Sequence, residues 1–278
     1  MMPKVEPPEI FLVDNGSLRP EATLALRELA TALSERVGGL IQPVSLLHSH
    51  KIDADLLGGE PATILKRALR HAAEGGKRRF IILPLFLGPS RAVIDYVPQV
   101  IEEVRAKYAD LEVTIAQTLA GGDVDAPDPR LAEMIEVSVR QLLYSEALTN
   151  VKIALVDHGT PYAPVNSLRN AVASQLAERL HGYPVCASSM ERRDAPEYDF
   201  NEPLLERVDQ AEGFSEGCLI VAMFFLLPGR HAGDGGDVSE ICEGLCARGV
   251  FDQVIRTPLL GEDSMLLEIL ADRLAAVR

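Results

Sequence analysis

The sequence contains few cysteines and has no long apolar run. Its four cysteines all lie in the second half of the 278 residues and form no disulfide framework, so we expect reduced thiols in a cytoplasm. The segment MMPKVEPPEI lacks a basic stretch followed by an apolar one, which predicts no secretory signal. An apolar run of ten residues at 218–227 is too short for a membrane span of roughly 20. These absences argue against a secreted disulfide scaffold and a membrane protein.

Basic residues are also scarce. The 27 lysines and arginines are outnumbered by 41 acids, which gives a net charge of −14 and argues against a nucleic-acid partner. Any anionic ligand must therefore be held by a local cluster of arginines that acts against the field of the whole protein. The glycine pairs at 38–39, 58–59, 75–76 and 121–122 lack the spacing of a P-loop or a dinucleotide fingerprint, so we expect no nucleotide cofactor.

Short apolar runs alternate with amphipathic stretches along the whole chain. In the first half the pattern predicts strands at 9–14, 42–47, 79–87 and 111–117, and helices at 20–37, 59–73, 92–108 and 129–145. In the second half it predicts strands at 150–157, 183–188, 218–227 and 251–256, and helices at 165–180, 202–211, 238–248 and 262–277. This order is typical of the α/β class, and it predicts in each half a parallel four-stranded sheet with helices on both faces.

The two halves also resemble each other in sequence. Asp14-Asn15-Gly16-Ser17 aligns with Asp157-His158-Gly159-Thr160, and PLFLGPSR at 84–91 aligns with MFFLLPGR at 223–230. We interpret this as an internal duplication with a boundary near Thr149. It predicts two domains, residues 1–148 and 149–278, with a cleft between them.

Three residues of the second half follow the ends of three separate predicted strands: His158, Glu191 and His231. The carboxyl ends of parallel strands meet at one edge of the sheet, so these side chains are able to converge. Two imidazoles and one carboxylate suit a borderline divalent metal and leave coordination positions open for a substrate. The alternative is two ordinary loop histidines bonded to backbone and a solvated glutamate at a turn.

Three segments resemble motifs of the class II chelatases, the family of sirohydrochlorin cobaltochelatases and ferrochelatases. They are Asp157-His158-Gly159-Thr160, the Met190-Glu191 pair and the stretch FLLPGRHAG at 225–233. The resemblance implies two tandem flavodoxin-like, three-layer domains. It also implies that His158, Glu191 and His231 bind the metal and assist its insertion into a tetrapyrrole.

The first half departs from these motifs. Asn15 replaces His158, Ala92 replaces His231, and either His48 or His50 replaces Glu191, depending on a two-residue slip in the comparison. The resemblance therefore implies one active site, in the second half, opposite a first half without the metal ligands.

The predicted activity is ATP-independent insertion of a divalent metal into sirohydrochlorin or a related tetrapyrrole, in cobalamin or siroheme biosynthesis. Co²⁺ is the preferred metal, with Fe²⁺ and Ni²⁺ as alternatives. Arg230, Arg91 and Asn15 are the candidates for binding the tetrapyrrole, the arginines through its carboxylates; a structural role in its turn is the alternative for Asn15.

Two other functions remain open: a non-catalytic carrier of metal or tetrapyrrole, and a chelatase for another porphyrin. The oligomeric state is open between monomer and homodimer. Cys242 and Cys246 share a predicted helix, but C-x₃-C without a second pair of ligands is a weak metal motif.

Overall fold

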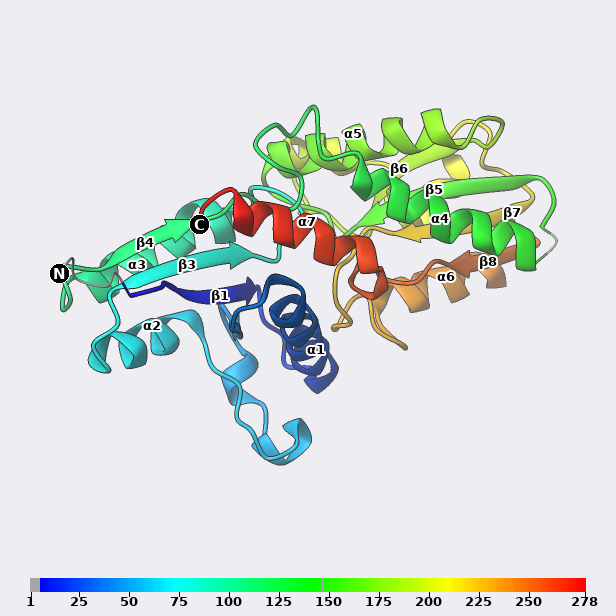
Figure 1. The fold of residues 1–278 in the computed structure, drawn as a ribbon. Coiled ribbons are helices and arrows are strands. Elements are labelled where there is room, and N and C mark those ends of the chain that lie inside the picture. The colour runs from blue at the N-terminus through cyan, green and yellow to red at the C-terminus, as the bar shows by residue number, and fades with distance from the viewer. Residues whose placement is uncertain (1–5, 147) are drawn as a thin grey trace. The chain divides into compact units, whose positions relative to one another are not determined.

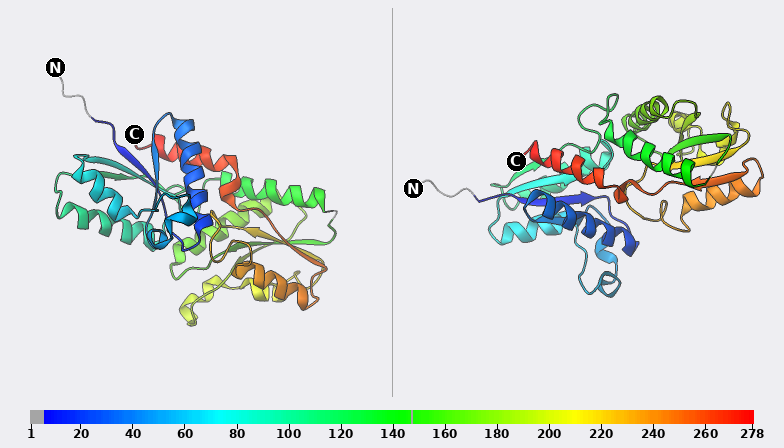
Figure 2. Two further views of the ribbon diagram at one scale, coloured as in Figure 1. Left: turned by 90° about the horizontal axis from the view of Figure 1, so that it is seen from below. Right: turned by 45° about the vertical axis from the view of Figure 1, so that its right-hand side comes forward.

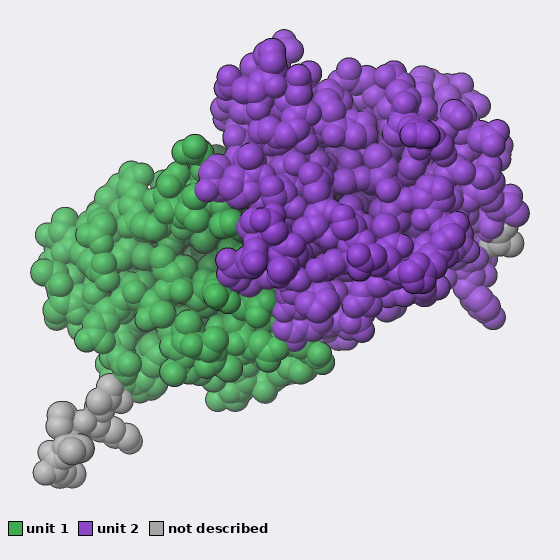
Figure 3. All heavy atoms as spheres, turned by 90° about the horizontal axis from the view of Figure 1, so that it is seen from above, with its two compact units in different colours: residues 1–119, 267–278 green, residues 120–266 purple. Residues whose placement is uncertain are grey.

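The structure is a computed structural model that describes residues 6–146 and 148–278. It has two compact units, residues 1–119 with 267–278 and residues 120–266, which are coloured separately in Figure 3. Each contains one four-stranded parallel sheet (Figure 1). No helix within the described ranges is long and apolar enough to cross a membrane. The predicted α/β class, with one parallel four-stranded sheet in each of two similar units, is confirmed.

Unit 1 is built on the sheet β2-β1-β3-β4. Its strands are β1 (Glu9–Asp14), β2 (Ile41–Ser45), β3 (Arg79–Pro84) and β4 (Glu112–Ile115). Alternate residues such as Phe11 and Phe80 pack on one face against α2 (Leu65–Glu74) and α3 (Val97–Arg105). Two further helices complete this unit, α1 (Pro20–Val37) and the greater part of α7 (Ser264–Ala275).

Unit 2 repeats the arrangement with the sheet β6-β5-β7-β8. Its strands are β5 (Val151–Asp157), β6 (Val185–Ser189), β7 (Cys218–Met223) and β8 (Gln253–Arg256). Helices α4 (Arg130–Ser145) and α5 (Ala163–Arg179) lie together on one face, and α6 (Asp237–Ala247) lies on the other (Figure 1). All six residues of β7 are buried, as expected for a central strand that is covered on both faces.

The compact units divide the chain at other positions than the predicted domains 1–148 and 149–278. Helix α4, which closes the first half of the sequence, packs against α5 and β7 in unit 2. Helix α7, which closes the second half and is red in Figure 2, belongs to unit 1. There Glu268 pairs with Arg36 of α1 at 3.3 Å. An apolar helix face can be buried against either of two similar sheets, so the hydrophobic pattern does not determine which sheet it covers.

Three predicted helices differ in the structure. The helix expected at 59–73 begins only at Leu65, and the segment before it contains the short 3₁₀ helix Ala54–Leu57. No α-helix lies at 202–211 in this described part of the chain: it holds the 3₁₀ helix Leu205–Gln210, whose Arg207 has non-helical angles (φ −121°, ψ 17°). The helix at 92–108 starts with a π-helical turn, Ala92–Tyr96, just before Pro98, which has no backbone N–H to donate.

Candidate functional site

The three predicted ligands lie in unit 2, on loops at the carboxyl ends of adjacent strands. His158 directly follows β5, Glu191 follows β6 by two residues, and His231 follows β7 at the end of the Pro-Gly-Arg turn. Because β6, β5 and β7 are neighbours in the sheet, these loops emerge side by side.

The loops after β5 and β6 are joined through their backbones. The amide of Glu191 donates to the carbonyl of His158 at 3.2 Å. Gly159, at φ 92°, makes this contact possible, because a Cβ there would lie 1.8 Å from the carbonyl oxygen of Glu191. The glycine of His-Gly-Thr therefore fixes the distance between His158 and Glu191.

The side chain of His158 contacts those of both other residues. His158 Nε2 lies 3.5 Å from Glu191 Oε1, and the His158 and His231 rings meet edge to face with centroids 4.5 Å apart and an interplanar angle of 74°. The Nδ1 atom of His158 lies 3.0 Å from the carbonyl oxygen of Gly159. The structure thus brings together the three residues that the sequence selects.

Their donor atoms do not already converge on one point. Within residues 6–146 and 148–278, no group of three or more His, Cys, Asp or Glu side chains is arranged to hold a metal ion. The side chains of Glu191, His158 and His231 are 60%, 46% and 32% exposed, so each has room to rotate. A metal would be bound here by side-chain reorientation on a fixed backbone.

The loop that carries His231 also brings an acidic partner to its ring. Asp237, the first residue of α6, is hydrogen-bonded through Oδ2 to Nδ1 of His231. Sequence analysis does not place Asp237 at the ring of His231. The sequence signal for this contact is the spacing of His231 and Asp237, which are six residues apart with a glycine-rich loop between them.

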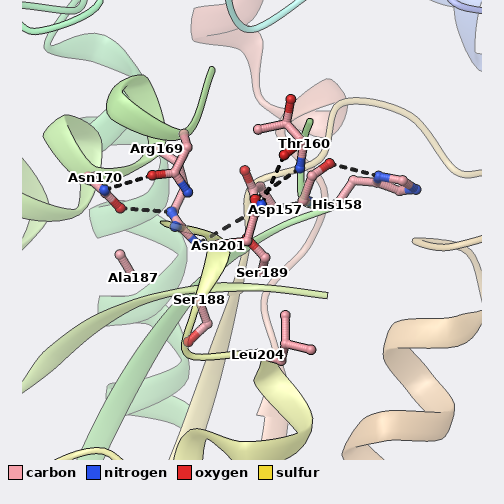
Figure 4. A network of polar contacts seen from close by, with 12 residues as sticks. Asp157, His158, Thr160, Arg169, Asn170, Ala187, Ser188, Ser189, Asn201 and Leu204 are labelled. Carbon is pink, nitrogen blue, oxygen red and sulfur yellow. Dashed lines mark hydrogen bonds and ion pairs between the residues drawn. The ribbon is translucent and has the colours of Figure 1, made fainter. Parts of the chain in front are cut away.

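A buried polar network lies behind His158 (Figure 4). Asp157 Oδ1 accepts from the Gly159 amide at 3.1 Å and from the Ser189 hydroxyl at 2.8 Å. Arg169 of α5, which is 1% exposed, donates from Nη1 to the same hydroxyl at 3.0 Å and lies 3.7 Å from Asp157 Oδ1. Burial raises the pKa of Asp157, whereas the nearby guanidinium lowers it. The network holds the end of β5 against β6.

The same network reaches the residue after Gly159. Asn201, which is fully buried, accepts from the Thr160 amide at 3.0 Å and donates to the Thr160 carbonyl at 2.9 Å. Both sides of Gly159 are therefore anchored. Sequence analysis does not identify Arg169 or Asn201, although a charged residue on the buried side of α5, beside Leu168 and Val172, is a sign of such a network.

Unit 1 shows what occupies the equivalent positions. Gly16 (φ 86°) repeats the contact of Gly159, because a Cβ there would lie 1.8 Å from the carbonyl oxygen of Leu47. The amide of Leu47 donates to the carbonyl of Asn15 at 3.1 Å, as that of Glu191 does to His158. Leu47, and not His48 or His50, thus takes the place of Glu191. A histidine near the strand end is chemically closer to a metal-binding glutamate than leucine is, so comparison by residue type selects His48 or His50 instead of Leu47.

The other equivalences agree with the sequence comparison. The Leu85 amide donates to the Val13 carbonyl as the Phe224 amide donates to the Val156 carbonyl, both at 2.8 Å, so Leu85 and Phe224 are equivalent. Counting seven residues on from each makes Ala92 the counterpart of His231. Asn15 follows β1 as His158 follows β5. Unit 1 therefore has Asn15, Leu47 and Ala92 where unit 2 has the three candidate ligands.

Asp14 is the counterpart of Asp157, but within residues 6–146 and 148–278 no arginine acts on its carboxyl group. These two aspartates are 143 residues apart in the sequence, and the same offset makes Leu26 the counterpart of Arg169. Asp14 Oδ1 is buried and has no hydrogen-bond partner among the described residues. Burial raises the pKa of Asp14 to about 6, although hydrogen bonds from Ser45 and the Gly16 amide oppose the shift.

Asp14→Asn is therefore expected to stabilise the protein at alkaline pH. A carboxyl group whose pKa is raised by folding costs no stability below its unfolded pKa of about 4 and the full penalty above its folded pKa of about 6. The full pKa shift corresponds to about 3 kcal/mol of stability. The cost of burying the asparagine amide reduces the gain from the substitution below this value. Urea unfolding should show Asp14→Asn more stable than the wild type by about 1–3 kcal/mol at pH 8, with that gain absent at pH 4.

The matched control for Asp14→Asn is Asp157→Asn in the other unit. There the substitution leaves Arg169 without its buried counter-charge, so a loss of stability at pH 8 is expected. A stability gain of Asp14→Asn that is equal at pH 4 and pH 8 would show that ionisation of Asp14 is not its cause.

The candidate arginines differ in their surroundings. Arg230 is exposed directly before His231, and no ion pair of its guanidinium is found among the described residues. Arg91 lies after β3 in unit 1 and pairs with Asp95 at 3.3 Å. Arg192, beside Glu191, instead binds Asp199 at 2.9 Å and Glu202 at 2.8 Å, so it stabilises its own loop.

The two cysteines of α6 do not form a thiolate site. Cys242 is buried and Cys246 is exposed. Burial raises the pKa of Cys242 to about 12, which disfavours the thiolate form that binds metals. Cys242 is part of the core between α6 and the sheet.

Comparisons with known proteins agree with this fold. The family model described as CbiX matches residues 9–142, which is just under half of the chain and lies mostly in unit 1. No curated protein matches the chain.

Solved structures match nearly its full length. SirB from Bacillus subtilis with Fe³⁺ has a TM-score of 0.69 and 12% identity, over 97% of this chain and 95% of that one. The sirohydrochlorin chelatase SirB from Bacillus subtilis subspecies spizizenii in complex with cobalt has a TM-score of 0.70 and 12% identity, over 97% and 94%. DR2241 from Deinococcus radiodurans, a multi-domain protein with structural similarity to chelatases, has a TM-score of 0.58 and 15% identity, over 96% and 54%. At these identities the likeness shows the fold.

Proposed function

We propose that this chain is a class II chelatase, like the CbiX proteins whose family model matches residues 9–142, and that it inserts a divalent metal into sirohydrochlorin or a closely related tetrapyrrole. The observation that carries the proposal is the contact of His158, Glu191 and His231 at the carboxyl ends of three adjacent strands. Co²⁺ is the preferred metal substrate, with Fe²⁺ and Ni²⁺ as alternatives, because all three are suited to two imidazoles and a carboxylate.

In the proposed mechanism the three side chains hold the metal only briefly. Two imidazoles and one carboxylate leave part of the coordination sphere open to the nitrogens of the macrocycle. Those nitrogens then replace the protein ligands one after another. The exposure of His158 and Glu191 supports this role, since the groups that hand over a metal must be able to move away from it.

The reaction balances without ATP or a redox partner. One M²⁺ enters the macrocycle and two protons leave its pyrrole nitrogens, so the net charge of the macrocycle is unchanged. A base must accept these protons. Glu191, or a histidine that has just released the metal, lies within the same small group of side chains and supplies it.

The tetrapyrrole carries several carboxylates, which require cations on a protein of net charge −14. Arg230, directly before His231 and exposed, is the principal candidate in unit 2. Arg91 and Asn15, which lie at the carboxyl ends of strands in unit 1, are proposed as further contacts. A guanidinium binds a carboxylate through two parallel hydrogen bonds and so also orients the ligand.

The direct test is to mix the purified chain with metal-free sirohydrochlorin and Co²⁺ in the absence of ATP and to follow the absorption of the macrocycle. The insertion rate is expected to exceed the uncatalysed rate and to rise in proportion to protein concentration. Tight binding of metal or macrocycle without a faster reaction would indicate the carrier function. Insertion into a more apolar porphyrin but not into sirohydrochlorin would indicate the third alternative.

A further inference from the structure

The loop between β7 and α6 folds back on itself and thereby joins His231 to Asp237. A Cβ on Gly236 would lie 2.6 Å from the carbonyl oxygen of Arg230 and 2.8 Å from that of His231, so only a glycine lets the chain pass this close. The amide of Val238 then donates to the His231 carbonyl at 3.1 Å. Asp237, between these two contacts, has its carboxylate at Nδ1 of the His231 ring.

We propose that Asp237 is a positioning residue that fixes the tautomer of His231. A neutral imidazole carries one N–H and one lone pair, and a carboxylate only accepts hydrogen bonds. Asp237 therefore places the proton of His231 on Nδ1 and leaves the lone pair on Nε2. The inference rests on the proposed function in one respect, namely that Nε2 is the atom that binds the metal.

The comparison between units supports a role tied to the imidazole. Ala92 and His231 are equivalent and lie 139 residues apart, and the same offset makes Pro98 the counterpart of Asp237. Pro98 lies near the start of α3 as Asp237 lies at the start of α6. At these two positions unit 1 thus lacks both the acid and the histidine; the acid of its own helix, Asp95, lies at a different position, in the π-helical turn Ala92–Tyr96 that precedes α3.

The first measurement determines the tautomer without any use of activity. The full chain is labelled with ¹⁵N-histidine, and long-range ¹H–¹⁵N spectra are recorded, with the His231 signals assigned by their absence from His231→Ala. We expect His231 in the wild type to be protonated at Nδ1. In Asp237→Ala we expect its population to shift to the Nε2–H form. An unchanged tautomer in Asp237→Ala would overturn the proposal.

Two acids of the same region serve as matched controls. Asp234 lies in the same loop, is fully exposed and is 3.7 Å from Arg256. Glu240 is the other acid in the first turn of α6. Asp234→Ala and Glu240→Gln are expected to leave the tautomer of His231 unchanged. A change in Glu240→Gln equal to that in Asp237→Ala would mean that helix charge controls the ring, and this would also overturn the proposal.

The second measurement is a titration with Co²⁺ alone, followed by the absorption bands of the bound ion. Asp237→Ala should weaken Co²⁺ binding about 10–100-fold with the band pattern retained, and Asp237→Glu should recover part of the loss. A changed band pattern in Asp237→Ala would make Asp237 a direct ligand and overturn the positioning role. If the wild type binds no Co²⁺, the proposed function fails, and the tautomer measurement alone decides the role of Asp237.

Discussion

His158→Ala and His231→Ala are each expected to lower kcat/KM for metal insertion by at least about 100-fold, the lower end of what loss of an acid–base group usually costs. Each substitution removes one of two imidazoles that are 4.5 Å apart, so the remaining imidazole and Glu191 hold the metal with fewer donors. The same change removes a possible acceptor for the pyrrole protons. The measurement is the initial insertion rate at several concentrations of metal and tetrapyrrole.

The control must separate loss of chemistry from loss of folding. Both histidines are partly exposed and lie on loops, so their substitution should leave the urea unfolding midpoint close to that of the wild type. His181→Ala, at an exposed position just after α5, should keep full activity. Insertion rates of folded His158→Ala and His231→Ala equal to the wild-type rate would remove both residues from the mechanism.

Arg169→Leu is expected to destabilise the protein by about 3–5 kcal/mol. The substitution reproduces in unit 2 the leucine that unit 1 has at the equivalent position, Leu26. It leaves Asp157 buried without its counter-charge, 3.7 Å from where the guanidinium was, and leaves the Ser189 hydroxyl without one donor. The measurement is the free energy of unfolding in urea at pH 7–8.

Two comparisons make this result specific to the buried pair. Arg179→Leu removes another arginine of α5, but one that is 31% exposed and bonded to Glu136 at 3.0 Å, so its cost should stay below about 1 kcal/mol. The double variant Asp157→Asn with Arg169→Leu should recover much of the stability that Arg169→Leu loses, because no unpaired charge remains. Equal losses in Arg169→Leu and Arg179→Leu would contradict the role of the buried pair.

The sequence was most informative where a local pattern had only one physical solution. The run of ten apolar residues at 218–227 predicts a strand that is covered on both faces, and residues 218–223 of it form the central strand β7. The position of His231 followed from that strand. The structure confirms the sequence similarity between Asp14-Asn15-Gly16 and Asp157-His158-Gly159, since a Cβ added to either glycine would lie 1.8 Å from a carbonyl oxygen of the next loop.

The sequence-based prediction was wrong where two alignments or two local structures fitted the same pattern. A two-residue slip made His48 or His50 the counterpart of Glu191, whereas the backbone hydrogen bond to Asn15 assigns that place to Leu47. The helix expected at 202–211 is replaced by the 3₁₀ helix Leu205–Gln210, and the residues before it bond to the end of β6 instead, where the Ser189 amide donates to the Pro203 carbonyl at 3.2 Å.

The sequence by itself determined the parallel α/β sheets, their repetition and the three residues at the strand ends, because these depend on hydrophobic period and on the order of strands along the chain. Only the tertiary structure decided which sheet α4 and α7 cover and which carboxylate meets the ring of His231. It alone also decided that Asp157 has a buried arginine beside it, whereas Asp14 has none among the residues that the structure describes. Those outcomes depend on contacts between segments far apart in the chain, and a local pattern carries no information about which of several equally apolar or equally charged partners will be nearest.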